Sequence, residues 1–217
     1  MKKKCVIIGA GDFFPGTFFA KMAEENKRDE YFIIVADGGW KYACAALILP
    51  DLIIGDFDSV TKEELEKIRS SNIETIELPE KKDETDLLAA IYYGQKIGLD
   101  EFHIFAGTGS RPDHSYANIQ CLTYLAKKDA RGYLYYPDSI ATVFKNGVLE
   151  FSKEKCGILS IFSISELSMG VTLKGLKYPL TDYTMLSSYP IGVSNEFSGA
   201  DSSVEVKDGM LLVFYSI

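Results

Sequence analysis

The first 136 residues alternate between short apolar runs and longer amphipathic stretches, and this alternation strongly constrains the fold. Strand and helix in repeated succession require crossover connections, and therefore a mainly parallel sheet with helices on both faces. Apolar runs without alternation, such as YFIIVA at residues 31–36, are typical of strands buried on both faces. The expected strands are Cys5–Ile8, Phe32–Ala36, Leu52–Ile54, Glu74–Leu78, Phe102–Ala106 and Gly132–Tyr136. The expected helices are Thr17–Glu25, Gly39–Leu47, Thr61–Ser70, Thr85–Ile97 and Pro112–Lys127.

A different pattern begins after about Pro137. In ATVFKNGVLEF two alternating arms flank Asn146-Gly147, and in VEVKDGMLLVF two such arms flank Asp208-Gly209. These dipeptides between alternating apolar residues predict β-hairpins with type I′ turns. No segment of helical periodicity and length occurs there. We therefore predict an α/β domain over residues 1–137 and an all-β sandwich over residues 138–217.

Composition narrows the choice of partners and compartment. The net charge of −8 and pI near 4.9 argue against nucleic acid, which requires a basic face. The four cysteines are widely spaced without a C-x-x-C pair, and three of them lie in apolar segments, which favours buried thiols in a reducing compartment over disulfides or zinc. No stretch approaches the roughly 18 apolar residues of a membrane helix. We expect a cytoplasmic protein with neither a nucleic-acid nor a membrane partner.

Glycines and acids cluster where the predicted strands end. Ligands of open α/β sheets bind beyond the carboxyl ends of the strands, so these clusters are expected to share one edge. Acids and glycines together with an arginine favour a site for an anion and a metal over separate turns. The spacing misses the dinucleotide fingerprint, and no G-x-x-x-x-G-K-[ST] loop occurs. The clusters are Gly9–Asp12, Asp37–Gly39, Asp56–Ser59, Lys82–Asp86 and Gly107–His114.

Asp56 and Asp58 are the acids that point most directly to a metal. In an extended chain, side chains two residues apart point the same way, with Cα atoms roughly 6.5–7 Å apart. Two adjacent carboxylates repel each other unless a cation lies between them, and Mg²⁺ takes oxygen ligands while leaving room for waters and phosphates. The alternative is a polar turn that closes a strand.

The remaining clusters also admit two interpretations. Asp83 and Asp86 fit the start of a helix, where one acid caps and another favours the dipole. Ser110 and Asp113 fit a capping box, but this leaves no role for Arg111 and His114. A guanidinium and backbone N–H groups at a helix start bind phosphate well. The residues thus predict a metal-assisted reaction on a phosphorylated substrate, with Arg111 contacting the developing charge.

The segments ADGGW, PDLIIGDFDS, KDETDLLAAI, GTGSRPDH, GLKYPL and GVSNEF, in this order, resemble those of the thiamin pyrophosphokinase family. The resemblance runs from about Ile7 to the C-terminus. It implies an N-terminal α/β domain, a C-terminal β-sandwich and a homodimer with active sites at the subunit interface. It also implies transfer of the diphosphoryl group of ATP to the hydroxyl of thiamine, giving thiamine diphosphate and AMP.

The same resemblance implies roles for individual residues. The acids that bind Mg²⁺ are Asp56, Asp58 and Asp86, and the catalytic set adds Arg111 and Asp113. The residues implied to contact ATP, its phosphates or the acceptor are Asp37, Gly38, Asp83, Thr85, Asp113 and His114. The residues implied to contact the thiamine pyrimidine are Ser194 and Asn195. Phe197 is the candidate for stacking on thiamine, with an ordinary core role as its alternative, because the only tryptophan is Trp40 in the first half. The general base stays open between Asp113 and Asp56.

Three other functions compete with this one. The acceptor of the diphosphoryl group would be another small alcohol, such as a hydroxymethylpterin. Alternatively, Asp56-Phe57-Asp58 would hold the metal of a nucleotide-sugar transferase. A nucleotide-sensing module would bind ATP without turnover.

Overall fold

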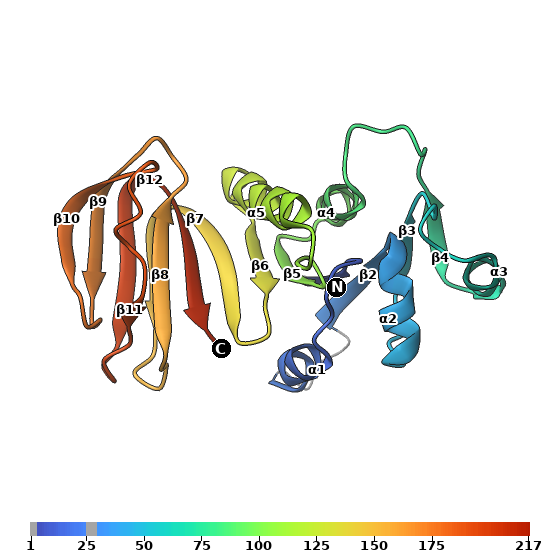
Figure 1. Ribbon diagram of the computed structural model, residues 1–217, viewed down its shortest axis with the longest axis horizontal. Coiled ribbons are helices and arrows are strands. Elements are labelled where there is room, and N and C mark those ends of the chain that lie inside the picture. The colour runs from blue at the N-terminus through green and yellow to red at the C-terminus, as the bar shows by residue number, and fades with distance from the viewer. Residues whose placement is uncertain (1–3, 25–29) are drawn as a thin grey trace. The chain divides into compact units, whose positions relative to one another are not determined.

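The computed structural model describes residues 4–24 and 30–217 and divides the chain into two compact units (Figure 1). The first unit comprises Met1–Cys121 with Leu134–Pro137, and the second comprises Leu122–Tyr133 with Asp138–Ile217. Helix α5 (Pro112–Lys127) and strand β6 (Arg131–Tyr135) therefore contribute residues to both units.

A parallel sheet forms the centre of the first unit. Its strands follow the order β5-β1-β2-β3-β4, and the four pairings between them are all parallel. This confirms the predicted α/β class. Because β2 and β5 flank β1 on opposite sides, the order of strands reverses beside β1, which is where α/β sheets bind ligands. The strands are β1 (Lys4–Ile8), β2 (Tyr31–Ala36), β3 (Leu52–Gly55), β4 (Glu74–Glu77) and β5 (Glu101–Phe105).

Helices cover both faces of this sheet. Helix α2 contacts β1 and β2 on one face, and α4 contacts β1, β2 and β3 on the other (Figure 1). The predicted strands and helices all have counterparts, with ends within two residues of the prediction where the structure describes them, and Glu25 lies outside the described residues. None of the helices in the described part of the chain is long and apolar enough to cross a membrane. The helical elements are α1 (Pro15–Glu24), the 3-10 turn η2 (Asp37–Gly39), α2 (Trp40–Ala45), α3 (Lys62–Ser70) and α4 (Asp86–Lys96).

The second unit is built from antiparallel strands, as predicted. The long strand β12 pairs with β7, β8 and β9, and inward-facing residues such as Leu159, Ile161 and Val204 are fully buried in its core. The strands are β7 (Ser139–Phe151), β8 (Ile158–Ser163), β9 (Leu167–Lys174), β10 (Leu180–Leu186), β11 (Asn195–Glu196) and β12 (Ser202–Ser216).

The two predicted hairpins are wrong. Asn146-Gly147 lies within β7 and Asp208-Gly209 within β12, and these two strands pair with each other along their length. Between the pairs Val206↔Gly147 and Met210↔Lys145, three residues of β12 oppose one residue of β7. The backbone N–H of Gly209 donates to Asn146 Oδ1 at 2.9 Å. The positive φ angles of Asn146 (41°) and Gly209 (127°) therefore form a bulge in two continuous strands rather than two chain reversals.

Candidate active site

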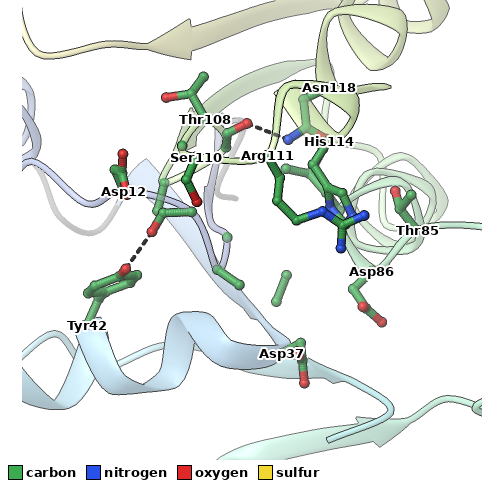
Figure 2. A pocket seen from close by; sticks show the side chains of 18 of the residues that line it. Asp12, Asp37, Tyr42, Thr85, Asp86, Thr108, Ser110, Arg111, His114 and Asn118 are labelled. Atoms are coloured by element: carbon green, nitrogen blue, oxygen red, sulfur yellow. Dashed lines mark hydrogen bonds between the residues drawn. The ribbon is translucent and has the colours of Figure 1, made fainter. Parts of the chain in front are cut away.

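A cavity of about 460 Å³ lies at the carboxyl ends of β1, β2 and β5 (Figure 2). Loops that follow these strands line it, together with the starts of α2, α4 and α5. Residues from four of the five clusters predicted from the sequence line this cavity. The fifth cluster, which contains Asp56 and Asp58, lies close to Asp37 of the cavity. The lining residues are Gly9–Asp12, Ala36, Asp37, Lys41, Tyr42, Thr85–Leu87, Ala106–Arg111, His114 and Asn118.

The floor of the cavity is backbone from two loops in close contact. The N–H of Gly9 donates to Phe105 O at 2.9 Å, and the N–H of Gly11 donates to Ala106 O at 2.8 Å. A Cβ atom on Gly11 would lie 2.2 Å from the carbonyl oxygen of Thr108. Glycine is required there because a side chain would push the loops apart.

Polar and charged side chains stand around the opening. Arg111 and His114 come from the start of α5, and Asp86 from the start of α4 (Figure 2). Thr85 caps α4, with its hydroxyl accepting from Leu88 N at 3.2 Å. The start of α4 therefore presents a helix N-terminus to the cavity, which favours a bound anion.

Arg111 lines the cavity and is paired with Asp113, which does not line it. Its Nη2 donates to Asp113 Oδ2 at 2.6 Å, and both side chains are well exposed. The hydrogen bond from Arg111 holds the pKa of Asp113 below its ordinary value and raises the pKa of Arg111. An exposed pair of this kind is weak, so Arg111 can exchange Asp113 for a phosphate at little cost.

Three carboxylates converge beside the cavity: Asp37, Asp56 and Asp58 each present an oxygen, and these oxygens lie within 4.8 Å of one another. Asp37 is only 8% exposed, and its Oδ2 accepts from Ser59 Oγ. Its other oxygen, Oδ1, is buried without a hydrogen-bond partner among the described residues. Leaving a buried charged oxygen unpaired is costly, so a cation is its natural partner. The oxygen-only donor set suits Mg²⁺.

Left-handed backbone shapes the loops that carry these acids. Asp37 (φ 44°), Phe57 (φ 59°) and Ala106 (φ 51°) follow β2, β3 and β5, and such a conformation is uncommon for residues other than glycine. The side chain of Phe57 is buried, which anchors the turn between Asp56 and Asp58. The extended geometry expected for this pair is therefore wrong, and the two carboxylates converge through a turn. Strain of this kind gathers at functional sites.

The three carboxylates that lie closest together differ in one member from the predicted metal-binding set, which stays a prediction. The close group consists of Asp37 with Asp56 and Asp58, whereas Asp86 is held by Lys82. Lys82 Nζ lies 2.6 Å from Asp56 Oδ2 and 2.9 Å from Asp86 Oδ1. Sequence reasoning placed Asp37 only on the nucleotide side and gave Lys82 no role, although Lys82 stands four residues before Asp86 in KDETD.

The pKa shifts follow from this arrangement. The charge of Asp56 raises the pKa of Asp58, and burial and Asp37 add to the effect. Burial alone would raise the pKa of Asp56, but hydrogen bonds from Lys82 and from the backbone of Asp58 bring it below its ordinary value. Burial raises the pKa of Asp86 more than Lys82 lowers it. Burial would lower the pKa of Lys82, yet its bonds to Asp56 and Asp86 raise it, so the ammonium is charged.

The other predicted site residues of the first unit lie outside the main cavity. Asp83 is exposed and does not line it, and Asp113 contacts it only through Arg111. Gly38 lines a smaller cavity of about 180 Å³. The residues of the main cavity that sequence reasoning did not select include Lys41, Tyr42 and Asn118. Lys41 and Tyr42 directly follow ADGGW, so their position was the available signal.

In the second unit, Asn195 is buried and fully engaged with backbone. Its Oδ1 accepts from Tyr178 N at 3.0 Å and Glu196 N at 2.9 Å, and its Nδ2 donates to Tyr178 O at 2.7 Å. Ser194 is exposed, and its N–H donates to Ser160 Oγ at 3.0 Å. Asn195 thus fixes the exposed Tyr178 against β11.

Phe197 stands at the edge of the core of the second unit. Its ring centroid lies 5.2 Å from that of Phe151, in an edge-to-face arrangement. The ring is partly buried against the core cluster. This contact favours the core role that the sequence left open for Phe197.

A parallel sheet gathers carboxylates and an arginine around a cavity at its carboxyl edge, and an antiparallel β unit follows it in the chain. Such a site offers the groups that a phosphate and a divalent ion require. The family model described as "Thiamin pyrophosphokinase, catalytic domain" matches residues 23–134, and "Thiamin pyrophosphokinase, vitamin B1 binding domain" matches residues 148–211. The chain therefore belongs to the thiamin pyrophosphokinase family.

Individual relatives agree with this assignment. The chain is 30% identical over 190 residues to thiamine pyrophosphokinase of Bacillus subtilis (strain 168), covering 87% of this chain and 89% of the relative. The crystal structure of thiamine pyrophosphokinase from Bacillus subtilis superposes with a TM-score of 0.87 at 26% identity, over 99% of both chains. The thiamin pyrophosphokinase of Geobacillus thermodenitrificans, at 23% identity, shares the fold with a TM-score of 0.83 over 99% of this chain and 97% of that one.

Proposed function

We propose that this protein transfers the diphosphoryl group of ATP to the hydroxyl of thiamine, giving thiamine diphosphate and AMP. The chain matches both thiamin pyrophosphokinase family models. The observation that carries the proposal is the Asp37 carboxylate in this chain: it lies close to Asp56 and Asp58, one of its oxygens is buried without a partner among the described residues, and it lines the same cavity as Arg111.

Asp37, Asp56 and Asp58 would hold Mg²⁺, which would neutralise phosphate oxygens of ATP when bound. The fit rests on their oxygen-only donor set, on their separations and on the unpartnered Asp37 oxygen. Asp86, which lines the cavity and is held by its ion pair with Lys82, would lie next to the phosphates of ATP.

The chain's own groups would do the rest by positioning. The N–H groups in the first turn of α4 would hold phosphate oxygens, because Thr85, Asp86 and Leu87 line the cavity. The loop of Gly9 and Gly11 would let the phosphates approach closely, since its N–H groups are already bonded to the neighbouring loop. Arg111 would leave Asp113 and bind the charge that develops as the diphosphoryl group moves. The thiamine hydroxyl needs little removal of its proton in a loose transition state, so neither Asp113 nor Asp56 has to be a strong base.

Other parts of the function stay proposals, some from the family resemblance and some from the sequence pattern and composition. They are the thiamine contacts of Ser194 and Asn195, the roles of Gly38, Asp83, Thr85 and His114, the division at residues 137/138, a homodimer with active sites at its interface, and a cytoplasmic location. Asn195 would act through the Tyr178 backbone that it holds, because its amide is already engaged there.

The test is an incubation of the purified protein with ATP, Mg²⁺ and thiamine, followed by chromatography of all products. We expect AMP and thiamine diphosphate in equal amounts, and neither without thiamine. ADP as the product, or AMP formation independent of thiamine, would contradict the proposal. A hydroxymethylpterin in place of thiamine, and a nucleotide sugar in place of ATP, test the two competing enzymes. Binding of ATP without turnover would identify a nucleotide sensor.

A further inference from the structure

Lys82 is inserted among the acids of the site. Its Nζ bridges Asp56 and Asp86 at 2.6 and 2.9 Å, and its side chain is only 12% exposed. Asp56 therefore belongs to two groups, because it also lies within the close trio with Asp37 and Asp58. An ammonium on a largely covered side chain, held by two carboxylates, is a fixed positive charge rather than a loose surface contact.

Charge explains why such a lysine is needed. With all four carboxyl groups ionised, the acids carry four negative charges, and Lys82 reduces them to three. One divalent ion at the trio reduces the remainder to one. A triphosphate would otherwise meet strong repulsion from acids a few ångströms away.

The acidic trio and Lys82 occupy separate places. Among the described residues, Asp37 Oδ1 and Asp86 Oδ1 are both buried without a hydrogen-bond partner, but only Asp86 Oδ1 has the ammonium of Lys82 beside it, as an ion pair at 2.9 Å. We propose that Lys82 fills a second cation position, between Asp56 and Asp86, and so replaces a second divalent ion. The free protein then takes one divalent ion, at Asp37, Asp56 and Asp58. The inference rests on the divalent-ion site of the proposed function but not on the identity of the acceptor.

The test measures Mn²⁺ binding by calorimetry and electron paramagnetic resonance, without nucleotide or thiamine. Lys82→Met should bind Mn²⁺ roughly tenfold more tightly than the wild type, because a like charge several ångströms from the ion is gone and a second position is open. Adding Asp86→Asn to Lys82→Met should remove this gain. Unchanged or weaker binding by Lys82→Met would overturn the proposal, as would binding by neither protein.

Two further variants separate charge from shape. Lys82→Arg keeps the charge and should bind Mn²⁺ within about twofold of the wild type, by the same electrostatic argument. A tenfold gain in Lys82→Arg would overturn the proposal even if Lys82→Met fails to fold. Lys81→Met is the matched control, because the neighbouring Lys81 is exposed, and it should leave Mn²⁺ affinity unchanged. Since no step uses ATP or thiamine, failure here is distinct from failure of the proposed reaction.

Discussion

Asp37 in the first unit and Asn195 in the second are both buried polar residues, with exposures of 8% and 5%, yet they are used differently. Asp37 keeps one oxygen without a hydrogen-bond partner, whereas the amide of Asn195 makes three hydrogen bonds to backbone. A buried group that is fully bonded stabilises its own fold. One left unbonded costs stability and is retained where a ligand completes it. The contrast supports our proposal that Asp37 binds a ligand, and it indicates that Asn195 supports the fold.

The largest effect is expected when Asp56 or Asp58, the acids next to Asp37, is made neutral. Asp56→Asn or Asp58→Asn should lower kcat for AMP formation by roughly three orders of magnitude, because the divalent ion loses a charged ligand. Circular dichroism should show a folded protein, since both residues lie in a polar loop beyond β3. AMP formation near the wild-type rate in either variant would remove the metal assignment.

Substitution of Arg111 tests whether its positive charge stabilises the transition state. Arg111→Ala should lower kcat at least about 100-fold if the guanidinium binds charge that develops during transfer. Arg69→Ala is the matched control, because Arg69 is an exposed residue of α3 and does not line the cavity. A change confined to KM would instead show a contact made equally in the ground state.

Paired substitutions at Asp37 and Asn195 test the comparison itself. Asn195→Ala should lower the free energy of unfolding by about 1–3 kcal/mol, because the Tyr178 N–H and C=O lose their partner. Without divalent ions, Asp37→Asn should raise the free energy of unfolding by about 1 kcal/mol, because one carboxylate is removed from a group of three that repel one another. Denaturant titrations with and without Mg²⁺ measure both. Equal losses in the two variants would mean that Asp37 is as structural as Asn195.

Most of the correct predictions rest on patterns within short stretches of the sequence. Apolar runs identify the parallel strands, and helix starts such as Thr61 with Glu64 are capping boxes legible in sequence. The general rule that ligands lie beyond strand ends then brings the acidic and glycine loops together. These inferences need no knowledge of which strands are neighbours.

The missed features depend on non-local geometry. Asn146-Gly147 suits a bulge as well as a turn, and only its pairing opposite Asp208-Gly209 distinguishes the two. The position of Asp37 beside Asp56 and Asp58 follows from the β2–β3 pairing, where a Cβ on Gly55 would lie 2.9 Å from Asp37 Cα. The bridge by Lys82 is likewise a contact across 26 residues.

The smallest expected effect concerns the amino end of the sheet, where the buried polar groups are paired. His103 is 2% exposed, with Nδ1 at 2.9 Å from Tyr135 Oη and Nε2 at 2.9 Å from Glu101 Oε1. Burial lowers the pKa of His103, although the hydrogen bond to Glu101 opposes this. That bond in turn holds the pKa of Glu101 below its ordinary value.

The sign of the pH dependence follows. Below the unfolded histidine pKa of about 6.5, the unfolded chain binds a proton that the folded chain does not, so stability falls as the pH falls. Between pH 7 and 5 we expect a loss of about 1 kcal/mol in the free energy of unfolding, a window above the titration of Glu101. Denaturant titrations at several pH values should show that His103→Gln makes the free energy of unfolding depend less steeply on pH between 7 and 5. If the pH dependence of the free energy of unfolding is unchanged in His103→Gln, then His103 does not cause it.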